Sequence, residues 1–502
     1  MEILQNLMVG LSHLFGITPI LLLVGGIFIG VVAGALPGIS FVNAMALALP
    51  FTYVMQPTNA MVFLSGLYCG GVFGGSISSI LINIPGSPGS LPATWDGYPM
   101  TKRGESARAL GIAITCSAIG GLASALMMIF VSPPFANFAL KFDQPEFFAA
   151  TVLGLVSVVA IAKGNMISSM VSLFIGLTVG AIGLDPLYAI PRLTFGWHVL
   201  DNGVSFVVVL IGMFAIGEVL GWISNRSAAK LRPAMQTHAR LPGLNDLYKL
   251  KGAISRGTGI GCAIGAIPGA GAIIGAIISY GVEKQVSNRG DEFGTGVEEG
   301  LAAPETAKNA TTGTATIPLL TLGIPGSAAT AIMLAALMLH GVNPGPMLFI
   351  TGIDLVYTVF AAYLVANLLM IAVGMLVARG FALLMKIPPV LLFGFIVVLC
   401  LVGAFGVRNN MADVYICIGF GILGYSLQRF NVPSAPLILG VILGPLAERY
   451  FLTSMISYDN QVSIFFTRPL SGSIIALAFA FLVWSLWPNI RQLLARRRVN
   501  LV

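Results

Sequence analysis

The sequence predicts an all-α polytopic membrane protein with about ten to thirteen transmembrane helices, at roughly 20 residues per span. We expect two homologous, inverted repeats that contain broken or re-entrant helices. Three observations support this fold class. The 502 residues are 57% hydrophobic and only 9% charged, whereas soluble domains carry about 25% charged residues. Long stretches lack Asp, Glu, Lys and Arg altogether, and two motifs with Pro-Gly pairs each occur twice.

The uncharged stretches define the expected spans. The first of them covers residues 3–95. The others cover residues 109–140, 164–184, 257–282, 309–353, 387–407 and 469–490. The chain has 60 glycines and 28 prolines, many of them inside these apolar runs, which is typical of transmembrane helices with breaks. This composition excludes disordered and collagen-like proteins.

Basic residues are concentrated in two places. Residues 226–256 contain seven Lys or Arg side chains against one acid, and the tail adds Arg491 and Arg496–Arg498, whereas no Lys or Arg precedes Lys102. The positive-inside rule therefore predicts a cytoplasmic linker and C-terminus and a periplasmic N-terminus. The expected parts are an N-terminal membrane repeat (1–225), a basic cytoplasmic linker (226–256) and a C-terminal membrane repeat with an extra helix (257–502).

The repeated motifs come in two ordered pairs. Gly30–Gly38 reads GVVAGALPG and Gly261–Gly269 reads GCAIGAIPG, while Ile84–Ser87 and Ile324–Ser327 both read IPGS. An ordered double repeat of this kind favours an internal duplication.

Each Pro-Gly pair is expected to break a helix, because proline removes an amide donor and glycine permits an irregular turn. The freed backbone groups are tolerated in a membrane only where protein or a water-filled cavity surrounds them. Paired breaks in two repeats are the best sequence indication of a transporter's central site, and we expect the four to converge near the membrane midplane. Close helix packing through GxxxG is the simpler alternative, but it does not account for Pro37-Gly38 and Pro268-Gly269.

The expected ligand of such a site is a carboxylate. A helix N-terminus carries about half a positive charge and free N–H groups, and we expect glycines such as Gly269 to let the backbone approach the ligand closely, with no buried arginine. The exposed carbonyls of the same breaks suit Na+. For any one hydroxyl, a hydrogen bond to its own helix backbone is the alternative. The candidate substrate-binding residues are Pro37, Gly38, Ser40, Asn43, Pro85, Gly86, Ser87, Pro268, Gly269, Gly271, Asn309, Thr312, Pro325, Gly326 and Ser327.

The candidate ion-coupling residues lie at the end of the charged stretch 283–308 and directly after it. Pro304 suits the first position of a helix, which would place Glu305 in the first turn, where an acid favours the helix dipole. The alternative is a simple first-turn acid that pairs with Lys308. Thr311 and Thr314 complete this candidate set.

The sequence lacks the motifs that several classes of enzyme and binding protein require. The basic residues follow membrane topology, so no nucleic acid partner is expected. The chain contains no GK[ST], HExxH or GxSxG motif, so phosphate-loop, zinc-protease and serine-hydrolase activities are not predicted. We therefore expect no enzyme and no cofactor, and an Na+ or H+ gradient as the drive. A non-transporting membrane scaffold or membrane enzyme is the alternative.

Several runs of the sequence resemble the large membrane subunit of the tripartite tricarboxylate transporters, and the resemblance covers essentially the whole chain. They are Asn83–Ser87, Asp96–Pro99, Ala303–Ala310, Leu320–Ser327, Leu439–Glu448 and Arg468–Pro469. One departure is Lys308, where the family usually has a small polar residue such as Asn, which puts the family's substrate and ion preference in question here.

The resemblance implies a multi-pass carrier of the bacterial inner membrane, in contact with membrane lipid, that takes up citrate-like carboxylates by Na+ or H+ symport. It also implies two protein partners, a small four-helix membrane subunit and a periplasmic solute-binding protein.

Overall fold

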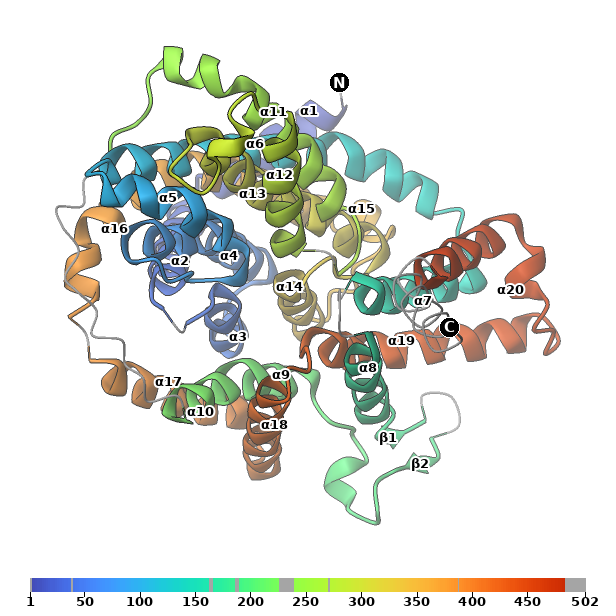
Figure 1. The fold of residues 1–502 in the computed structure, drawn as a ribbon. Helices are drawn as coiled ribbons and strands as arrows, with labels where there is room; N and C mark the ends of the chain where they lie inside the picture. Colours follow the sequence, from blue (N-terminus) through green and yellow to red (C-terminus); the bar gives the residue numbers. More distant parts are fainter. Residues whose placement is uncertain are drawn as a thin grey trace, which may run out of the picture.

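The computed structural model describes residues 2–37, 39–161, 166–185, 189–224, 239–269, 271–386 and 388–483. Almost all of them are helical (Figure 1). The strands of the described part are β1 (Gly183–Leu184) and β2 (Pro191–Arg192), which form a two-stranded antiparallel pair. The predicted all-α architecture is confirmed.

Seven long helices form the centre of the bundle. They are α2 (Ile17–Ala35), α4 (Pro57–Ile82), α6 (Ser106–Ala139), α11 (Leu244–Gly265), α12 (Gly271–Val286), α13 (Glu298–Leu322) and α16 (Ile353–Leu384). Shorter elements join or cover them. These are α1 (Glu2–Leu14), α3 (Phe41–Thr52), α5 (Pro92–Lys102), α14 (Ala328–Leu339), α15 (Leu348–Thr351) and the 3₁₀ turns η1 (Pro88–Ser90) and η4 (Gly290–Glu292).

The remaining helices form two peripheral groups, which Figure 1 places to the right of and below the centre. The first group contains α7 (Gln144–Ile161), α8 (Met166–Gly180), α19 (Ala435–Ser457) and α20 (Ile464–Thr467). The second contains α9 (Phe206–Leu210), the π-helical turn η3 (Ile211–Ile216), α10 (Gly217–Ser224), α17 (Pro389–Arg408) and α18 (Met411–Arg429). The 3₁₀ turn η2 (His198–Leu200) precedes α9.

Eight helices of the described residues are long and apolar enough to cross a membrane, and five shorter apolar helices accompany them. The most apolar window of α4 is 100% buried, whereas that of Val390–Arg408 is 28% buried. Helix α4 is therefore enclosed by other helices, whereas α17 has an apolar outer face, as is typical of a lipid-exposed helix.

Glycines bring α2 and α4 into backbone contact. A Cβ atom added at Gly30 would lie 2.3 Å from the carbonyl oxygen of Leu67, and one at Gly70 would lie 2.5 Å from that of Ile27. The same contact recurs one turn on, between Gly34 and Gly71. Because the residue numbers rise together along the contact, the two helices run parallel. Small residues permit this close approach between membrane helices.

Helices α11 and α13 repeat this geometry in the second half of the chain. Gly257 and Gly261 of α11 meet the carbonyl oxygens of Ala303 and Ala307, with Cβ distances of 2.5 and 2.2 Å. The residue numbers again rise together, so α11 and α13 are also parallel. Each half therefore has the order of glycine-lined helix, break, shorter helix (α3 or α12), longer helix (α4 or α13) and break.

Helices α4 and α13 run in opposite directions where they cross. Ser76 of α4 bonds Glu305 of α13. Four residues further along α4, Ile80 lies beside Gly97 of α5 together with Leu301, which is four residues before Glu305 in α13. An inverted repeat requires this antiparallel relation between corresponding helices. The internal duplication itself stays a prediction, as do the membrane orientation and the two repeat boundaries.

The predicted linker is partly helical. Residues 225–238 lie outside the described residues, but α11 begins at Leu244, so the basic residues Lys249, Lys251 and Arg256 belong to this central helix. Arg256 bonds both carboxylate oxygens of the buried Glu283. The C-terminal arginines also lie outside the described residues.

Asp96 fixes the start of α13. Its buried carboxylate accepts hydrogen bonds from the backbone N–H groups of Gly294, Gly296 and Val297, at 2.8 to 2.9 Å, and from the hydroxyl of Tyr280. A carboxylate at a helix N-terminus also interacts favourably with the helix dipole. Asp96 thus joins α5 of the first half to the entry of α13.

We expect Asp96→Asn to lower the free energy of unfolding by about 2 kcal/mol, because the hydrogen bonds then lose their charged acceptor. Asp246→Asn is the matched control, since Asp246 also caps a helix but is partly exposed, and its loss is expected to cost under about 1 kcal/mol. Thermal unfolding in detergent measures both. Equal shifts would contradict the role given to Asp96.

Candidate functional site

All four Pro-Gly pairs lie between helices, at the α2–α3, α4–η1, α11–α12 and α13–α14 connections. Gly38 of the first pair lies outside the described residues. Asn83 after α4 and Gly323 after α13 both adopt the left-handed conformation, with φ of 59° and 72°. This conformation ends a helix, so both IPGS motifs follow the same kind of helix end.

Each broken segment folds back onto its own half. The N–H of Gly86 donates to the carbonyl of Gly75 at 3.2 Å, and a Cβ at Gly86 would lie 1.9 Å from the carbonyl oxygen of Gly34. In the second half, the N–H of Gly269 donates to the carbonyl of Gly326 at 2.9 Å. The two breaks of each half therefore meet. Their depth in the bilayer stays a prediction.

The backbone conformation and the packing at position 269 both require glycine. Gly269 has a φ of +83°, and a Cβ there would lie 2.3 Å from Cγ2 of Val158 in α7. The expectation from the sequence was that glycine at this position allows close approach of a ligand. The backbone conformation and the packing against α7 already require it, so a ligand is not needed to explain it.

The breaks of the two halves meet around Tyr68 of α4. The Tyr68 hydroxyl and Ser327 Oγ are 3.3 Å apart, and the Tyr68 ring stacks on Phe41 at 5.9 Å between centroids. Gly271, at the start of α12, lies against Ser327, with its added Cβ 3.9 Å from Cβ of the serine. The N-terminal ends of α3, α12 and α14 are thus gathered in one place, and each carries partial positive charge.

Several predicted ligand hydroxyls are bonded within their own helices. Ser40 Oγ accepts from the N–H of Val42, and Ser327 and Thr330 form a reciprocal capping box. The hydroxyls of Thr311, Thr312 and Thr314 donate to the carbonyls of Lys308, Asn309 and Ala310, at 2.7 to 2.9 Å. The three threonines therefore follow the alternative stated above, in which the hydroxyl bonds the backbone of its own helix.

Some predicted residues lie apart from one another. Thr311 and Thr314 face α11 and α12, against Gly265 and Gly275, and not the side of α13 that carries Glu305. Asn43 lines a small cavity next to η3, together with Ile39, Leu47, Ala215, Glu218, Val219, Phe393 and Ile396. Asn43 is therefore separate from the candidate ion-coupling group.

A buried ion pair stands at the centre of the bundle. Glu305 and Lys308, each 1% exposed, are 3.0 Å apart. Ser76 of α4 and Ser117 of α6 donate to the two carboxylate oxygens at 2.7 and 3.0 Å. The Asn309 amide donates to the Ser117 hydroxyl at 2.8 Å. Side chains of both halves thus hold one carboxylate.

The expected position of Glu305 in a first helical turn is wrong. Helix α13 begins at Glu298, and Pro304 and Glu305 lie in its interior. The helix starts earlier because Asp96 binds the amides that precede it and because Glu298 and Glu299 occupy the first turn. The pairing of Glu305 with Lys308, which belonged to the alternative of a simple first-turn acid, is present.

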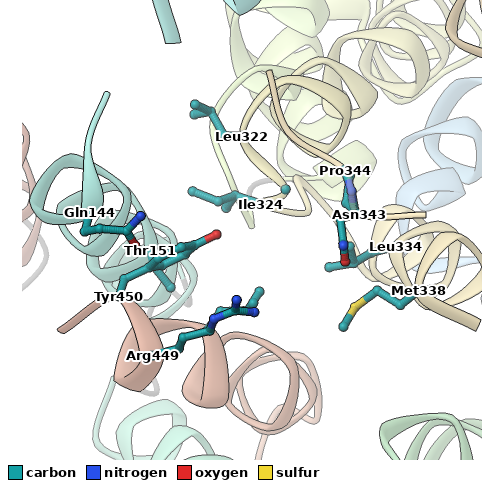
Figure 2. Close-up of a pocket in the computed structure, with 12 residues that line it drawn as sticks. Gln144, Thr151, Leu322, Ile324, Leu334, Met338, Asn343, Pro344, Arg449 and Tyr450 are labelled. Carbon is teal, nitrogen blue, oxygen red and sulfur yellow. The ribbon is translucent and has the colours of Figure 1, made fainter. Parts of the chain in front are cut away.

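A cavity of about 230 Å³ opens beside the fourth break. Figure 2 shows Arg449 and Tyr450 projecting from α19 into the space between α7 and the residues Leu334 and Met338 of α14. The complete lining is Gln144, Thr151, Leu322, Gly323, Ile324, Leu334, Met338, Asn343, Pro344, Leu446, Arg449 and Tyr450. It combines an apolar wall with a guanidinium, a phenol and two amides.

Arg449 has no carboxylate partner among the residues that the structure describes. Its neighbour Glu448 pairs instead with Arg192, at 3.1 Å. An unpaired guanidinium in a cavity suits a carboxylate ligand, which it can bind through two parallel hydrogen bonds. Nothing in the sequence around Arg449 distinguishes it from the other arginines of the chain, so it was not among the predicted site residues.

Comparison with known proteins agrees with this architecture. Residues 20–439 match the model of the tripartite tricarboxylate transporter TctA family. A protein of Agrobacterium vitis, "Uncharacterized 52.8 kDa protein in TAR-I ttuC' 3'region", is 34% identical over 492 residues, which are 98% of either chain. A second one, "Uncharacterized protein in TAR-II ttuC' 3'region", is 37% identical over 232 residues, which are 46% of this chain and 96% of that protein.

No solved structure matches the chain significantly. The family model and the full-length relative together cover the broken helices, the buried ion pair and the cavity residues. The chain therefore belongs to the tripartite tricarboxylate transporter TctA family.

Proposed function

We propose that this chain is the large permease subunit of a tripartite carrier that takes up small carboxylates through the bacterial inner membrane by Na+ or H+ symport. The observation that carries the proposal is the cavity of Figure 2, in which the unpaired Arg449 faces the fourth break. The membership in a transporter family supports the same function.

The cavity residues suggest how a carboxylate is received. The cavity of about 230 Å³ has room for several water molecules, which a bound carboxylate displaces. The Arg449 guanidinium attracts and orients the carboxylate, while the amides of Gln144 and Asn343 offer donors and acceptors to hydroxyl or further carboxyl groups. Leu334 and Met338 supply an apolar wall that excludes water.

Arg449 is exposed, and this matters for release. Ion pairs that remain in contact with water contribute only about 0–1 kcal/mol, so the ligand is not held irreversibly. The helix ends around Tyr68 and Ser327 provide a second positive region further inside. We propose that the carboxylate passes between these two regions during transport.

The same proposal includes two protein partners. A periplasmic solute-binding protein delivers the carboxylate, and a small four-helix membrane subunit completes the carrier. Substrate choice can then reside in the binding protein, because a guanidinium and helix N-termini recognise charge more than the shape of the carbon skeleton.

Uptake into proteoliposomes tests the function. The vesicles contain this chain and the small subunit, and each candidate binding protein is supplied with a panel of labelled carboxylates. We expect accumulation of at least one carboxylate that collapses when the ion gradients are dissipated. Absence of uptake with every binding protein and substrate, in vesicles that contain folded protein, would contradict the proposal.

Arg449→Ala tests the cavity. We expect the KM for the transported carboxylate to rise up to about fivefold, since an ion pair that stays in contact with water contributes about 0–1 kcal/mol. Arg429→Ala is the control, because Arg429 is an exposed arginine that contacts only hydroxyl groups of α10 and α18. If the kinetics of Arg449→Ala are unchanged, the cavity does not lie on the transport path.

A further inference from the structure

The ammonium group of Lys308 is surrounded by oxygen atoms from three elements. Glu305 Oε1 of α13 lies at 3.0 Å and Ser90 Oγ of η1 at 3.3 Å, and the ammonium also donates to Ser76 Oγ of α4. The Lys308 side chain is 1% exposed. A carboxylate and two hydroxyls around a buried point are the kind of oxygen ligands that hard cations take in proteins.

These oxygen atoms are held in place independently of Lys308. Ser117 donates to the second oxygen of Glu305, and Asn309 in turn donates to Ser117. Ser90 is bonded to Ser87 at 3.0 Å, directly after the second Pro-Gly pair. Asn309 Oδ1 is buried and has no hydrogen-bond partner among the described residues. The group is therefore a pre-formed negative pocket at a helix break.

We infer that the ammonium of Lys308 occupies a monovalent-cation site formed by Glu305, Ser76 and Ser90, so that this chain takes no Na+ at this position. A tethered ammonium and a bound Na+ cannot share one set of ligands. The residues that would suit a coupling Na+ at the second break are already used by the chain's own cation.

A cation site occupied by Lys308 has one consequence for Na+ binding and another for transport. The first concerns binding, namely that Na+ does not stabilise the wild-type protein through this pocket. The second concerns transport and rests on the proposed function, namely that carboxylate uptake does not require Na+. A purely structural ion pair would share the first property, but its removal would not create a site for Na+.

Two variants distinguish these cases. Lys308→Ala empties the pocket and leaves Glu305, Ser76 and Ser90 free to bind an ion. Lys308→Met also removes the charge, but its side chain fills most of the space. Thermal unfolding of the wild type and both variants is compared in NaCl and in choline chloride at equal ionic strength. Uptake in proteoliposomes is compared in the same two salts.

For the wild type, we expect equal unfolding temperatures and equal uptake rates in the two salts. Lys308→Ala is expected to unfold at a higher temperature in NaCl than in choline chloride, since a ligand that binds the folded state stabilises it. Its uptake is expected to be faster in NaCl, because Na+ then replaces the missing ammonium beside Glu305. Lys308→Met is expected to respond to neither salt.

Two results would overturn the inference. One is a wild-type protein that loses uptake in choline chloride, and the other is a Lys308→Ala protein whose unfolding temperature does not respond to Na+. If Lys308→Ala does not fold in either salt, the wild type can still overturn the inference, because a wild-type protein that loses uptake in choline chloride contradicts it. If the wild type transports no carboxylate, the proposed function fails, while the unfolding measurements continue to test the cation site.

Discussion

Gly30→Leu is expected to prevent stable association of α2 with α4. The carbonyl oxygen of Leu67 and the N–H nitrogen of Gly71 lie 2.3 and 2.8 Å from the position of the new Cβ. Both are backbone atoms, so no side chain can move aside, and the helices must separate along their whole contact. We expect a loss of more than about 3 kcal/mol in folding free energy, seen as little folded protein in detergent.

Gly25→Leu is the matched control for this prediction. Gly25 lies on the same helix, and an added Cβ would meet nothing within 4 Å. Its replacement is expected to change the folding free energy by about 0.5 kcal/mol or less. Size-exclusion chromatography and thermal unfolding compare the two variants. If both behave alike, the parallel contact of α2 and α4 does not hold the fold together.

Glu305→Gln has the second large expected effect, because it leaves the ammonium of Lys308 buried without a countercharge. Removing one partner of a buried ion pair costs about 3–5 kcal/mol. The double variant Glu305→Gln/Lys308→Met carries no charge at this point, and we expect it to regain most of the lost stability. The measurement is thermal unfolding of the purified protein.

Glu283→Gln provides the comparison for Glu305. Glu283 is also 1% exposed and ion-paired, but the side chain of its partner Arg256 is 37% exposed and reaches water. Loss of the Glu283 charge therefore strands no buried cation, and we expect a smaller destabilisation than for Glu305→Gln. A Glu305→Gln protein that is as stable as Glu283→Gln would show that Lys308 escapes to solvent or loses its proton.

The sequence was sufficient to predict the helical membrane fold and the four helix breaks. Uncharged runs and Pro-Gly pairs are local signals, since their effect on a helix depends only on the residues next to them. The left-handed helix ends at Asn83 and Gly323 follow from the same local chemistry. The pairing of Glu305 with Lys308 was also foreseeable, because the two residues lie one helical turn apart.

The rest of the candidate site depends on contacts between distant parts of the chain. Ser76 meets Glu305 across more than 200 residues, and the Figure 2 cavity joins α7, α14 and α19. No periodicity marks Ser76, Ser117 or Arg449 among similar residues nearby. The start of α13 was misplaced for the same reason, because its N-terminus is fixed by Asp96, about 200 residues earlier.

The charged interior of α13 also bears on the biogenesis of the protein. Among the described helices, α13 is not one of the eight that are apolar enough to cross a membrane, and a charged side chain at a helix centre costs about 2.5–3.5 kcal/mol during insertion. The hydroxyls that bond the Glu305 carboxylate of α13 belong to Ser76 of α4 and Ser117 of α6. Both of these helices are synthesised before α13. The direction of synthesis thus lets the first half act as an intramolecular chaperone, since α13 can enter the bilayer only against helices that are already in place.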